Sequence, residues 1–458
     1  MVLVHPRPSQ RMRYAAEVVF HDWHGLTVEW SPHGSIEGWV EARVGDAVVS
    51  RWQVHAVARD ETRPEDQPEV LWHTWSVDSP KHGPCVLPLP CAMAEEKDAS
   101  MGFDVLGAAL HGLTCWSEQA DEVARDMHGR PLPMEIDGQP IQWNGHRWPM
   151  SQRHRMPWVE CMALLLVEAW GLSDDRDSTF GWKPTFDVDV AFCHLGRPRW
   201  KSHLLQCRDV VLGRWQAASM RRRVLSGKSK DPYDTYAWIK DFHRNEALTW
   251  YVLAAKRRRP YDVGLDPHSP ALSGLKESLT HHEGGALVRW HPGHEAMSSE
   301  EALLQERSEA LQWARGDHRG IRAHFLRSEP GEAWRTWERL GVEEDCSLGW
   351  SREVGFRGGV SRPYMVFDLA SNARLQLMVE PIAVMDSALQ AGLNVRPEAV
   401  MDVVTPMMDV VHDVGGSWVI CWHNTSVSER DGWKGWQAAY ISMVQRARSM
   451  GHQTNDHA

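Results

Sequence analysis

Short apolar segments typical of β-strands alternate with amphipathic segments typical of helices along the second half of the chain. Strands are predicted around residues 185–192, 248–253, 285–291, 321–326, 375–381 and 418–423. Helices are predicted over 299–313, 333–340 and 397–414. Neighbouring parallel strands need a crossover connection, which is usually a helix. The alternation therefore predicts an α/β fold with a mainly parallel sheet or a barrel.

The first part of the chain reads as shorter elements broken by turn residues. A strand is predicted over 48–57, and helices over 101–126 and 156–170. The segment 84–91 holds three prolines, which argues against a central strand. A polar stretch at 173–178 marks the predicted domain boundary. We therefore expect a smaller α/β N-terminal domain, 1–178, followed by a main domain, 179–458.

Composition and charge exclude several function classes. The formal net charge of −11 argues against a general nucleic-acid binder, which needs a basic surface. The sequence contains no run of about 18 apolar residues, so no membrane span is predicted. The eight cysteines form no CxxC pair and no secretory signal is recognised, so free thiols and a cytoplasmic location are expected. The basic clusters 221–223 and 257–259 are interpreted as solvated faces rather than anion sites.

Ionisable residues recur where the predicted strands end. Asp187 and Asp189 are two apart, so they share one face of a strand. His291 follows the next strand but one, Arg322 and His324 are again two apart, and His423 ends the last strand. Each feature alone also fits a solvated turn, an ion pair or a satisfied core histidine. Because the carboxyl ends of parallel strands carry the active site in such folds, their convergence indicates metal-assisted hydrolysis.

These residues lie in segments that resemble the polysaccharide deacetylase family, the NodB-type homology domain. The branch with an extra N-terminal domain is the most similar, and the resemblance spans roughly residues 100–445. The segments that carry it are 184–192, 231–236, 290–294, 320–327, 347–359, 380–386, 421–425 and 432–436.

The resemblance implies a distorted (β/α) barrel that holds one divalent metal, usually zinc, and a carbohydrate substrate. Asp187 would be the general base and Asp189 a metal ligand. His291 would be the first histidine ligand, Arg322 would orient Asp187 and lower its pKa, and His423 would be the general acid.

The motifs of this chain depart from the usual family pattern in three places. The family places a second histidine four residues after the first, where this chain has Glu295, with His294 one residue earlier. The third motif usually reads Arg-x-Pro, whereas His324 stands here two residues after Arg322. His324 is our choice for the third ligand, with His294 and Glu295 as rivals. Val188 separates the two aspartates, so their roles as base and ligand can be exchanged.

Six further residues are candidates for substrate binding. Arg357 would neutralise a substrate charge or pair with Asp386, and a buried structural pair is the alternative. Trp350 and Trp422, and also Trp433 and Trp436, would form platforms for sugar rings, although tryptophan at such density is more often core or groove wall.

The sequence therefore predicts a metal-dependent hydrolase that removes acetyl groups from an N-acetylated sugar or polysaccharide. A non-catalytic carbohydrate-binding protein on the same scaffold is the alternative, favoured by the irregular second motif. A hydrolase of another C–N bond is the third possibility, because a scaffold does not fix the acyl group or the amine. The sequence does not determine the oligomeric state.

Overall fold

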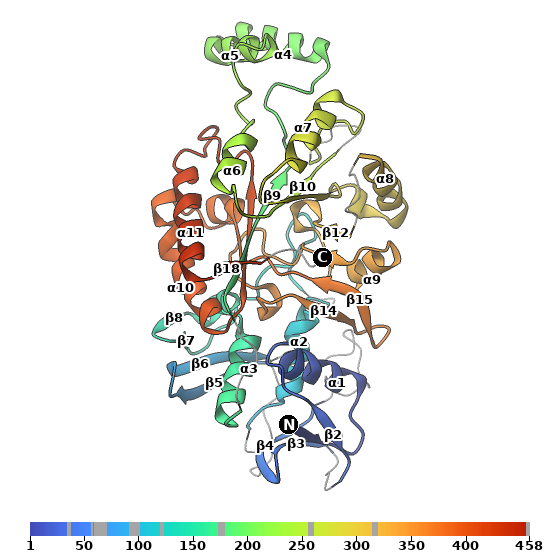
Figure 1. Ribbon diagram of the computed structural model, residues 1–458, viewed down its shortest axis with the longest axis vertical. Helices are drawn as coiled ribbons and strands as arrows, with labels where there is room; N and C mark the ends of the chain where they lie inside the picture. Colours follow the sequence, from blue (N-terminus) through green and yellow to red (C-terminus); the bar gives the residue numbers. More distant parts are fainter. Residues whose placement is uncertain are drawn as a thin grey trace.

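Three β-sheets form the framework of the protein (Figure 1). The computed structural model describes residues 1–33, 38–55, 58, 71–90, 101–119, 123–172, 179–254, 261–313 and 319–454. Within these ranges, no helix has both the length and the apolar character needed to cross a bilayer. The basic cluster 257–259 and Cys91 lie outside the described residues. The other seven cysteines are free thiols, as predicted.

The largest sheet has ten strands and comes entirely from the second part of the chain. Its members are β9 (Gly181–Val188), β10 (Leu248–Val252), β11 (Ala286–Trp290), β12 (Gly320–Ile321), β13 (Glu344–Asp345), β14 (Tyr364–Asp368), β15 (Ala373–Val379), β16 (Val384–Met385), β17 (Ser417–His423) and β18 (His452–Gln453). The order is β14-β15-β13-β12-β11-β10-β9-β17-β16, and β18 pairs with β9. Every pair is parallel except β14 with β15, which confirms the predicted α/β fold with a mainly parallel sheet.

Helices connect these strands. They are α4 (Arg199–Val211), α5 (Trp215–Leu225), α6 (Tyr236–Phe242), α7 (Pro270–Thr280), α8 (Glu300–Trp313), α9 (Glu332–Arg339), α10 (Val400–Asp413) and α11 (Trp436–Met450). All residues of β9 are buried, because β10 and β17 flank it and helices cover the sheet. The parallel order brings the carboxyl ends of β9, β11, β12 and β17 to one edge, where an active site is expected.

The chain runs directly from β15, which is next to one end of the strand order, to β16 at the other end. Residues 380–383 run from β15 to β16, and no ladder joins β14 to β16 among the described residues. Two backbone hydrogen bonds bridge this stretch, from Ile382 to Leu348 and from Ala383 to Val419. Closure into a distorted barrel therefore stays a prediction.

Two four-stranded sheets and three α-helices make up the first part of the chain. The first sheet, in the order β2-β1-β3-β4, contains β1 (Val2–Val4), β2 (Glu29–Ser31), β3 (Trp39–Val44) and β4 (Ala47–Gln53). The second, in the order β5-β6-β7-β8, contains β5 (Trp72–Ser79), β6 (Gly83–Pro90), β7 (Ile141–Trp143) and β8 (His146–Trp148). The helices are α1 (Gln10–Ala16), α2 (Val105–Leu113) and α3 (Trp158–Ala169).

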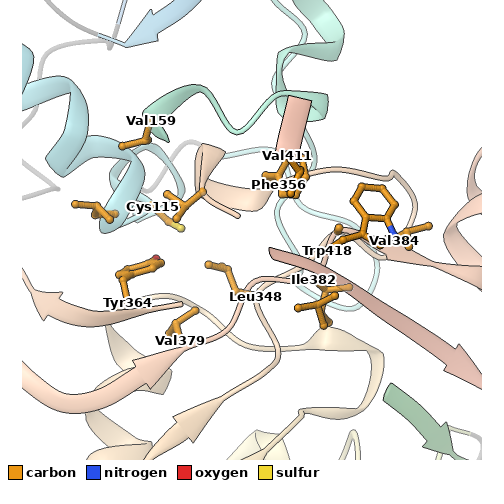
Figure 2. Close-up of a cluster of buried hydrophobic side chains, with 14 of the residues drawn as sticks. Cys115, Val159, Leu348, Phe356, Tyr364, Val379, Ile382, Val384, Val411 and Trp418 are labelled. Atoms are coloured by element: carbon orange, nitrogen blue, oxygen red, sulfur yellow. The ribbon is translucent and has the colours of Figure 1, made fainter. Parts of the chain in front are cut away.

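The first part of the chain shares one continuous hydrophobic core with the main sheet. Figure 2 shows Cys115 and Val159 beside side chains from the main sheet and its loops, including Tyr364, Val379 and Trp418. The predicted boundary at 178/179 falls between α3 and β9. The division into an accessory domain, 1–178, and a main domain, 179–458, stays a prediction.

The prediction that residues 84–91 cannot form a central strand is wrong. β6 lies between β5 and β7. Its prolines, Pro84, Pro88 and Pro90, are spaced by two or four residues, so their missing N–H groups would all face one edge. The ladder to β7 involves only Val86, whereas the ladder to β5 covers the whole strand. The structure also shortens the helix predicted over 101–126 to Val105–Leu113.

A network of charged side chains is buried within the main sheet. The Lys183 ammonium lies 2.8 Å from a Glu380 oxygen and 3.5 Å from Glu344, and Arg289 binds Glu344 with two contacts of 2.9 Å. Glu344, Glu380 and Cys346 are close enough together to hold a metal ion. Because Lys183 and Arg289 already balance the two carboxylates, we assign no metal there.

Breaking this network is expected to destabilise the fold. Lys183→Met leaves Glu380 buried without this cation, so we expect a loss of about 3 kcal/mol in the free energy of unfolding. Arg339 and Glu300 form an exposed pair, and Arg339→Met is the matched control, with a loss of about 1 kcal/mol or less. Urea unfolding measures both. Equal losses would contradict the assignment of a stabilising buried network.

Candidate metal centre

The carboxyl edge of the main sheet gathers the polar residues that the sequence places at strand ends. Asp187 is the last residue but one of β9 and is buried, and Asp189 follows the strand. His291 follows β11, and Arg322 follows β12. His423, the last residue of β17, is the register partner of Asp187. Parallel pairing thus brings residues from more than 230 positions apart in the chain into one site.

Asp189, His291 and His324 form a cluster whose ligand atoms all lie within 4.8 Å of one another. One carboxylate oxygen of Asp189 lies 3.1 Å from Nε2 of His291, and the other lies 3.2 Å from Nε2 of His324. Nε2 of a third histidine, His423, lies 3.4 Å from a carboxylate oxygen of Asp189. Two imidazoles and one carboxylate are a donor set that suits zinc and related divalent ions.

The second ring nitrogen of each clustered histidine is held by a fixed acceptor. Nδ1 of His291 faces the carbonyl oxygen of Arg322, which can only accept a hydrogen bond. Nδ1 of His324 lies 3.0 Å from the carboxylate of Asp262. Both contacts place the proton on Nδ1 and leave Nε2 available toward Asp189, as a metal ligand requires. The residues present therefore fit a divalent metal.

Asp262 is a member of the site that sequence reasoning missed. It belongs to no predicted element, and it also accepts hydrogen bonds from the backbone N–H groups of His294 and Glu295. The contact with His324 joins two loops 62 residues apart. No local signal in the sequence indicates that such a contact forms.

Asp187 is buried beside Arg322. Nη1 of Arg322 donates to Asp187 Oδ1 at 2.8 Å and to the Thr185 hydroxyl at the same distance. The guanidinium also stacks 4.1 Å from the ring centre of Tyr251. Burial alone raises the pKa of Asp187, but the positive charges of Arg322 and of the nearby histidines outweigh it and lower the pKa. Asp187 is therefore an ionised carboxylate that can accept a proton.

His423 is held by a carboxylate of its own. Nδ1 of His423 lies 2.7 Å from Oδ1 of Asp386, and its backbone N–H donates to the other oxygen. Burial lowers the pKa of His423, but Asp386 and Asp189 outweigh it and raise the pKa well above the usual value. The ring therefore carries a proton at neutral pH, which suits a general acid.

The site opens into a cleft of about 380 Å³. Asp187, Asp189, His324 and His423 line its base. The other lining residues come from loops and short turns, from the end of β16 and from the helical segment that follows it, and they are Arg130, Phe325, Leu326, Ser351, Arg352, Met385, Ser387, Ala391 and Gly392. Arg130 belongs to the first part of the chain, so both parts contribute to the cleft.

The predicted strand over 321–326 is wrong, although both of its polar residues reach the site. β12 ends at Ile321, and His324 begins a single 3₁₀ turn. Phe325 and Leu326 have φ values of 62° and 53°, which no strand contains. Arg322 and His324 therefore do not share a strand face, and they contact different carboxylates, Asp187 and Asp189.

His294 and Glu295, the two alternatives to His324 as the third metal ligand, make other contacts. The ring of His294 packs against Tyr261 and Phe325, with its Nε2 3.2 Å from Nδ1 of His128. The cluster of ligand atoms described above does not include it. Glu295 donates its backbone N–H to Asp262. The structure therefore brings His324, and not His294, to Asp189 and His291.

Three residues predicted to bind substrate are placed elsewhere. Arg357 is buried and pairs with Glu118 at 2.8 Å, while Asp386 pairs with His423, so the two do not meet. Trp422 is fully buried and cannot present a ring to a sugar. Trp350 packs against His154 and lines a separate small pocket. Trp436 is also buried.

Metal affinity is expected to fall as the pH is lowered. Burial lowers the pKa of His324, but Asp189 and Asp262 outweigh it and raise the pKa to about 9 without metal. A ligand must be deprotonated, so below this pH binding displaces a proton and the affinity falls about tenfold for each pH unit. Zinc titrations between pH 6 and 8 measure the slope of affinity against pH. Asp262→Asn would shift the pH range in which the affinity falls to lower pH. An affinity independent of pH would contradict the role of His324.

Comparisons with known proteins give only distant matches. No protein-family model and no curated protein sequence matches the chain. A solved structure from Mycobacterium smegmatis, described as a polysaccharide deacetylase, aligns with 63% of this chain and 97% of its own, at 15% identity and a TM-score of 0.35. Another described in the same way, from Pseudomonas aeruginosa PAO1, aligns with 60% of this chain and 87% of its own, at 14% identity and a TM-score of 0.37. At this level of similarity, the function has to be argued from the geometry of the site.

Proposed function

We propose that the protein is a metal-dependent hydrolase that removes an acetyl group from an N-acetylated sugar. The observation that carries the proposal is the meeting of three groups in one cleft. They are the cluster of Asp189, His291 and His324, the arginine-paired Asp187, and the carboxylate-paired His423. When bound, a divalent ion supplies a Lewis acid that polarises a carbonyl and makes water acidic enough to ionise near neutral pH.

The contacts of the two aspartates favour separate roles for them. Asp189 faces three histidines, as a metal ligand does. Asp187 contacts Arg322 and the thiol of Cys421, and lies 3.9 Å from the nearest imidazole nitrogen. Asp187 is therefore proposed as the general base that takes a proton from the attacking water, and Asp189 as the ligand.

His423 is proposed as the general acid. Its Nε2 faces the cleft side of Asp189, while Asp386 holds Nδ1 and fixes the ring. A protonated imidazole in this position can donate a proton to the nitrogen of the amine as the C–N bond breaks. Arg322 does not reach the substrate in this scheme, because it acts through Asp187 as a positioning residue.

The site fits a polar substrate better than an apolar one. The cleft is lined by Ser351, Ser387, Arg130 and Arg352, in addition to the charged residues of the metal centre. Hydroxyls and guanidinium groups can bind the hydroxyls of a sugar, and Phe325 adds an apolar surface at the same opening. A carbohydrate that carries an acetamide is the substrate class that this lining supports.

Metal content tests the proposal. The wild type is expected to bind about one divalent ion per chain and His291→Ala to lose it, because the two remaining ligands do not hold the ion. His412, which is half exposed on α10, provides the matched control His412→Ala. Elemental analysis gives the stoichiometry. The absence of bound metal from the reconstituted wild type would exclude the mechanism and favour a carbohydrate-binding protein on the same scaffold.

A further inference from the structure

A helical hairpin formed by α4 and α5 projects from the end of the molecule opposite the two small sheets (Figure 1). Its helices are held together by a buried ion pair, Asp209 with Arg221 at 2.7 Å, and by Ala218 and Val224. Large apolar side chains, by contrast, are exposed. These are Trp200, Leu204, Val210, Val211, Leu212, Trp215 and Leu225. The hairpin therefore keeps its charged pair inside and presents apolar groups to its surroundings.

The exposed apolar residues are concentrated on one stripe and at the tip. Trp200, Leu204 and Val211 recur at the spacing of one helical face. They are 64%, 63% and 83% exposed. Val211 lies at the end of α4 and Trp215, 66% exposed, at the start of α5, on either side of the turn. Soluble proteins rarely expose so many large apolar side chains together unless something covers them.

The charge of the hairpin is opposite to that of the rest of the chain. Residues 197–230 contain ten Lys and Arg and one Asp, a net formal charge of +9, whereas the whole chain carries −11. Arg214 and Arg222 are among the exposed basic residues. Basic side chains around apolar residues that include tryptophan are typical of elements that lie in the interface of an anionic membrane.

We propose that the α4–α5 hairpin docks the protein on the surface of an anionic phospholipid bilayer. The apolar stripe and tip enter the headgroup region, and the basic residues bind lipid phosphates. This binding is peripheral, since the hairpin contributes only two short helices. It goes beyond the hydrolase proposal and does not depend on it.

The base of the hairpin fixes its direction relative to the metal centre. The hairpin begins ten residues after Asp189. The carboxylate of Asp231, at its far end, accepts hydrogen bonds from the backbone N–H groups of Cys193, His194 and Leu195 at its near end. A docked hairpin therefore turns the carboxyl edge of β9 toward the bilayer. If the proposed hydrolase activity holds, this orientation favours an acetylated sugar attached to a lipid.

Vesicle co-sedimentation of the full-length protein tests the proposal. We expect binding to phosphatidylcholine vesicles that contain phosphatidylglycerol, weaker binding as salt rises, and little binding to phosphatidylcholine alone, since each basic residue near an anionic surface strengthens binding roughly fivefold. Leu204→Gln/Val211→Gln should weaken binding at least tenfold. Leu304→Gln/Val48→Gln, at exposed apolar sites elsewhere, should leave it unchanged. Arg214→Gln/Arg222→Gln should weaken it more than Arg147→Gln does.

Three results would overturn the proposal. They are no binding to anionic vesicles, equal binding to neutral ones, or equal losses in the hairpin variant and its control. A wild-type oligomer that dissociates in Leu204→Gln/Val211→Gln, with no vesicle binding, would assign the hairpin to contact between copies instead. Metal content and acetate release from a soluble sugar are measured in parallel. Their retention in the variants shows that the fold is intact and keeps failure of this proposal separate from failure of the hydrolase proposal.

Discussion

Asp187→Asn is expected to lower the rate of acetate release about a thousandfold, because an amide cannot accept the proton of the attacking water. The substitution keeps the size of the side chain and leaves the Arg322 contact with Thr185 in place. The rate is measured on N-acetylglucosamine oligosaccharides. Asp402→Asn, at an exposed site on α10, is the matched control and should leave the rate unchanged.

The same variant distinguishes the roles of the two aspartates as general base and metal ligand. Metal content should survive in Asp187→Asn, because Asp187 lies beside the cluster and is not one of its three members. Asp189→Asn should instead lose metal and activity together, because the carboxylate that faces His291 and His324 is then removed. The opposite pattern, with metal lost only in Asp187→Asn, would show that the roles of base and ligand are exchanged.

The residues at strand ends were the part of the site that the sequence could predict. Apolar runs followed at once by Asp187, His291 or His423 indicate both a buried strand and a polar edge, and parallel pairing then brings such edges together. Period-two and helical patterns need only local information. The strands that lead to His291 and His423 are accordingly predicted within one residue of where the structure has them, whereas β9 spans Gly181–Val188 and not 185–192.

His324 was chosen for a reason that the structure does not support. His324 does not share a strand face with Arg322, because the strand ends at Ile321 and a turn with positive φ values follows. Tight turns of this kind depend on packing around Phe325 rather than on a glycine or asparagine signal. Asp262 and Arg130 could not be predicted either, because loops distant in the chain bring them to the site.

Burial explains why the substrate-binding residues were predicted less well. A tryptophan beside an active-site strand looks the same in the sequence whether it faces a cleft or the core. Trp422 follows Cys421 in β17 and points to the side away from Asp187, toward Trp436 and Tyr440. Arg357 finds its carboxylate in Glu118, a residue from the other part of the chain. Such partners are set by the tertiary fold.

Removal of the metal is expected to abolish activity without unfolding the protein. Without a Lewis acid, the pKa of water stays far above neutral pH, whereas that of metal-bound water is about 7, so Asp187 alone cannot generate the nucleophile, and we expect a loss of more than about 10⁴-fold. In the metal-free protein, protonated His324 bridges Asp189 and Asp262, which compensates the buried carboxylates. The chelated protein should therefore keep its circular dichroism spectrum and show a lower melting temperature than the metal-bound form.

Reconstitution decides whether the loss comes from the metal. Zinc or cobalt added to the chelated wild type should restore activity in proportion to bound ion, since both accept two imidazoles and a carboxylate. The same addition should not rescue His324→Ala, whereas it should rescue His412→Ala fully. Turnover by protein shown by elemental analysis to be metal-free would contradict the mechanism, because no other group among the described cleft residues can supply the missing Lewis acid.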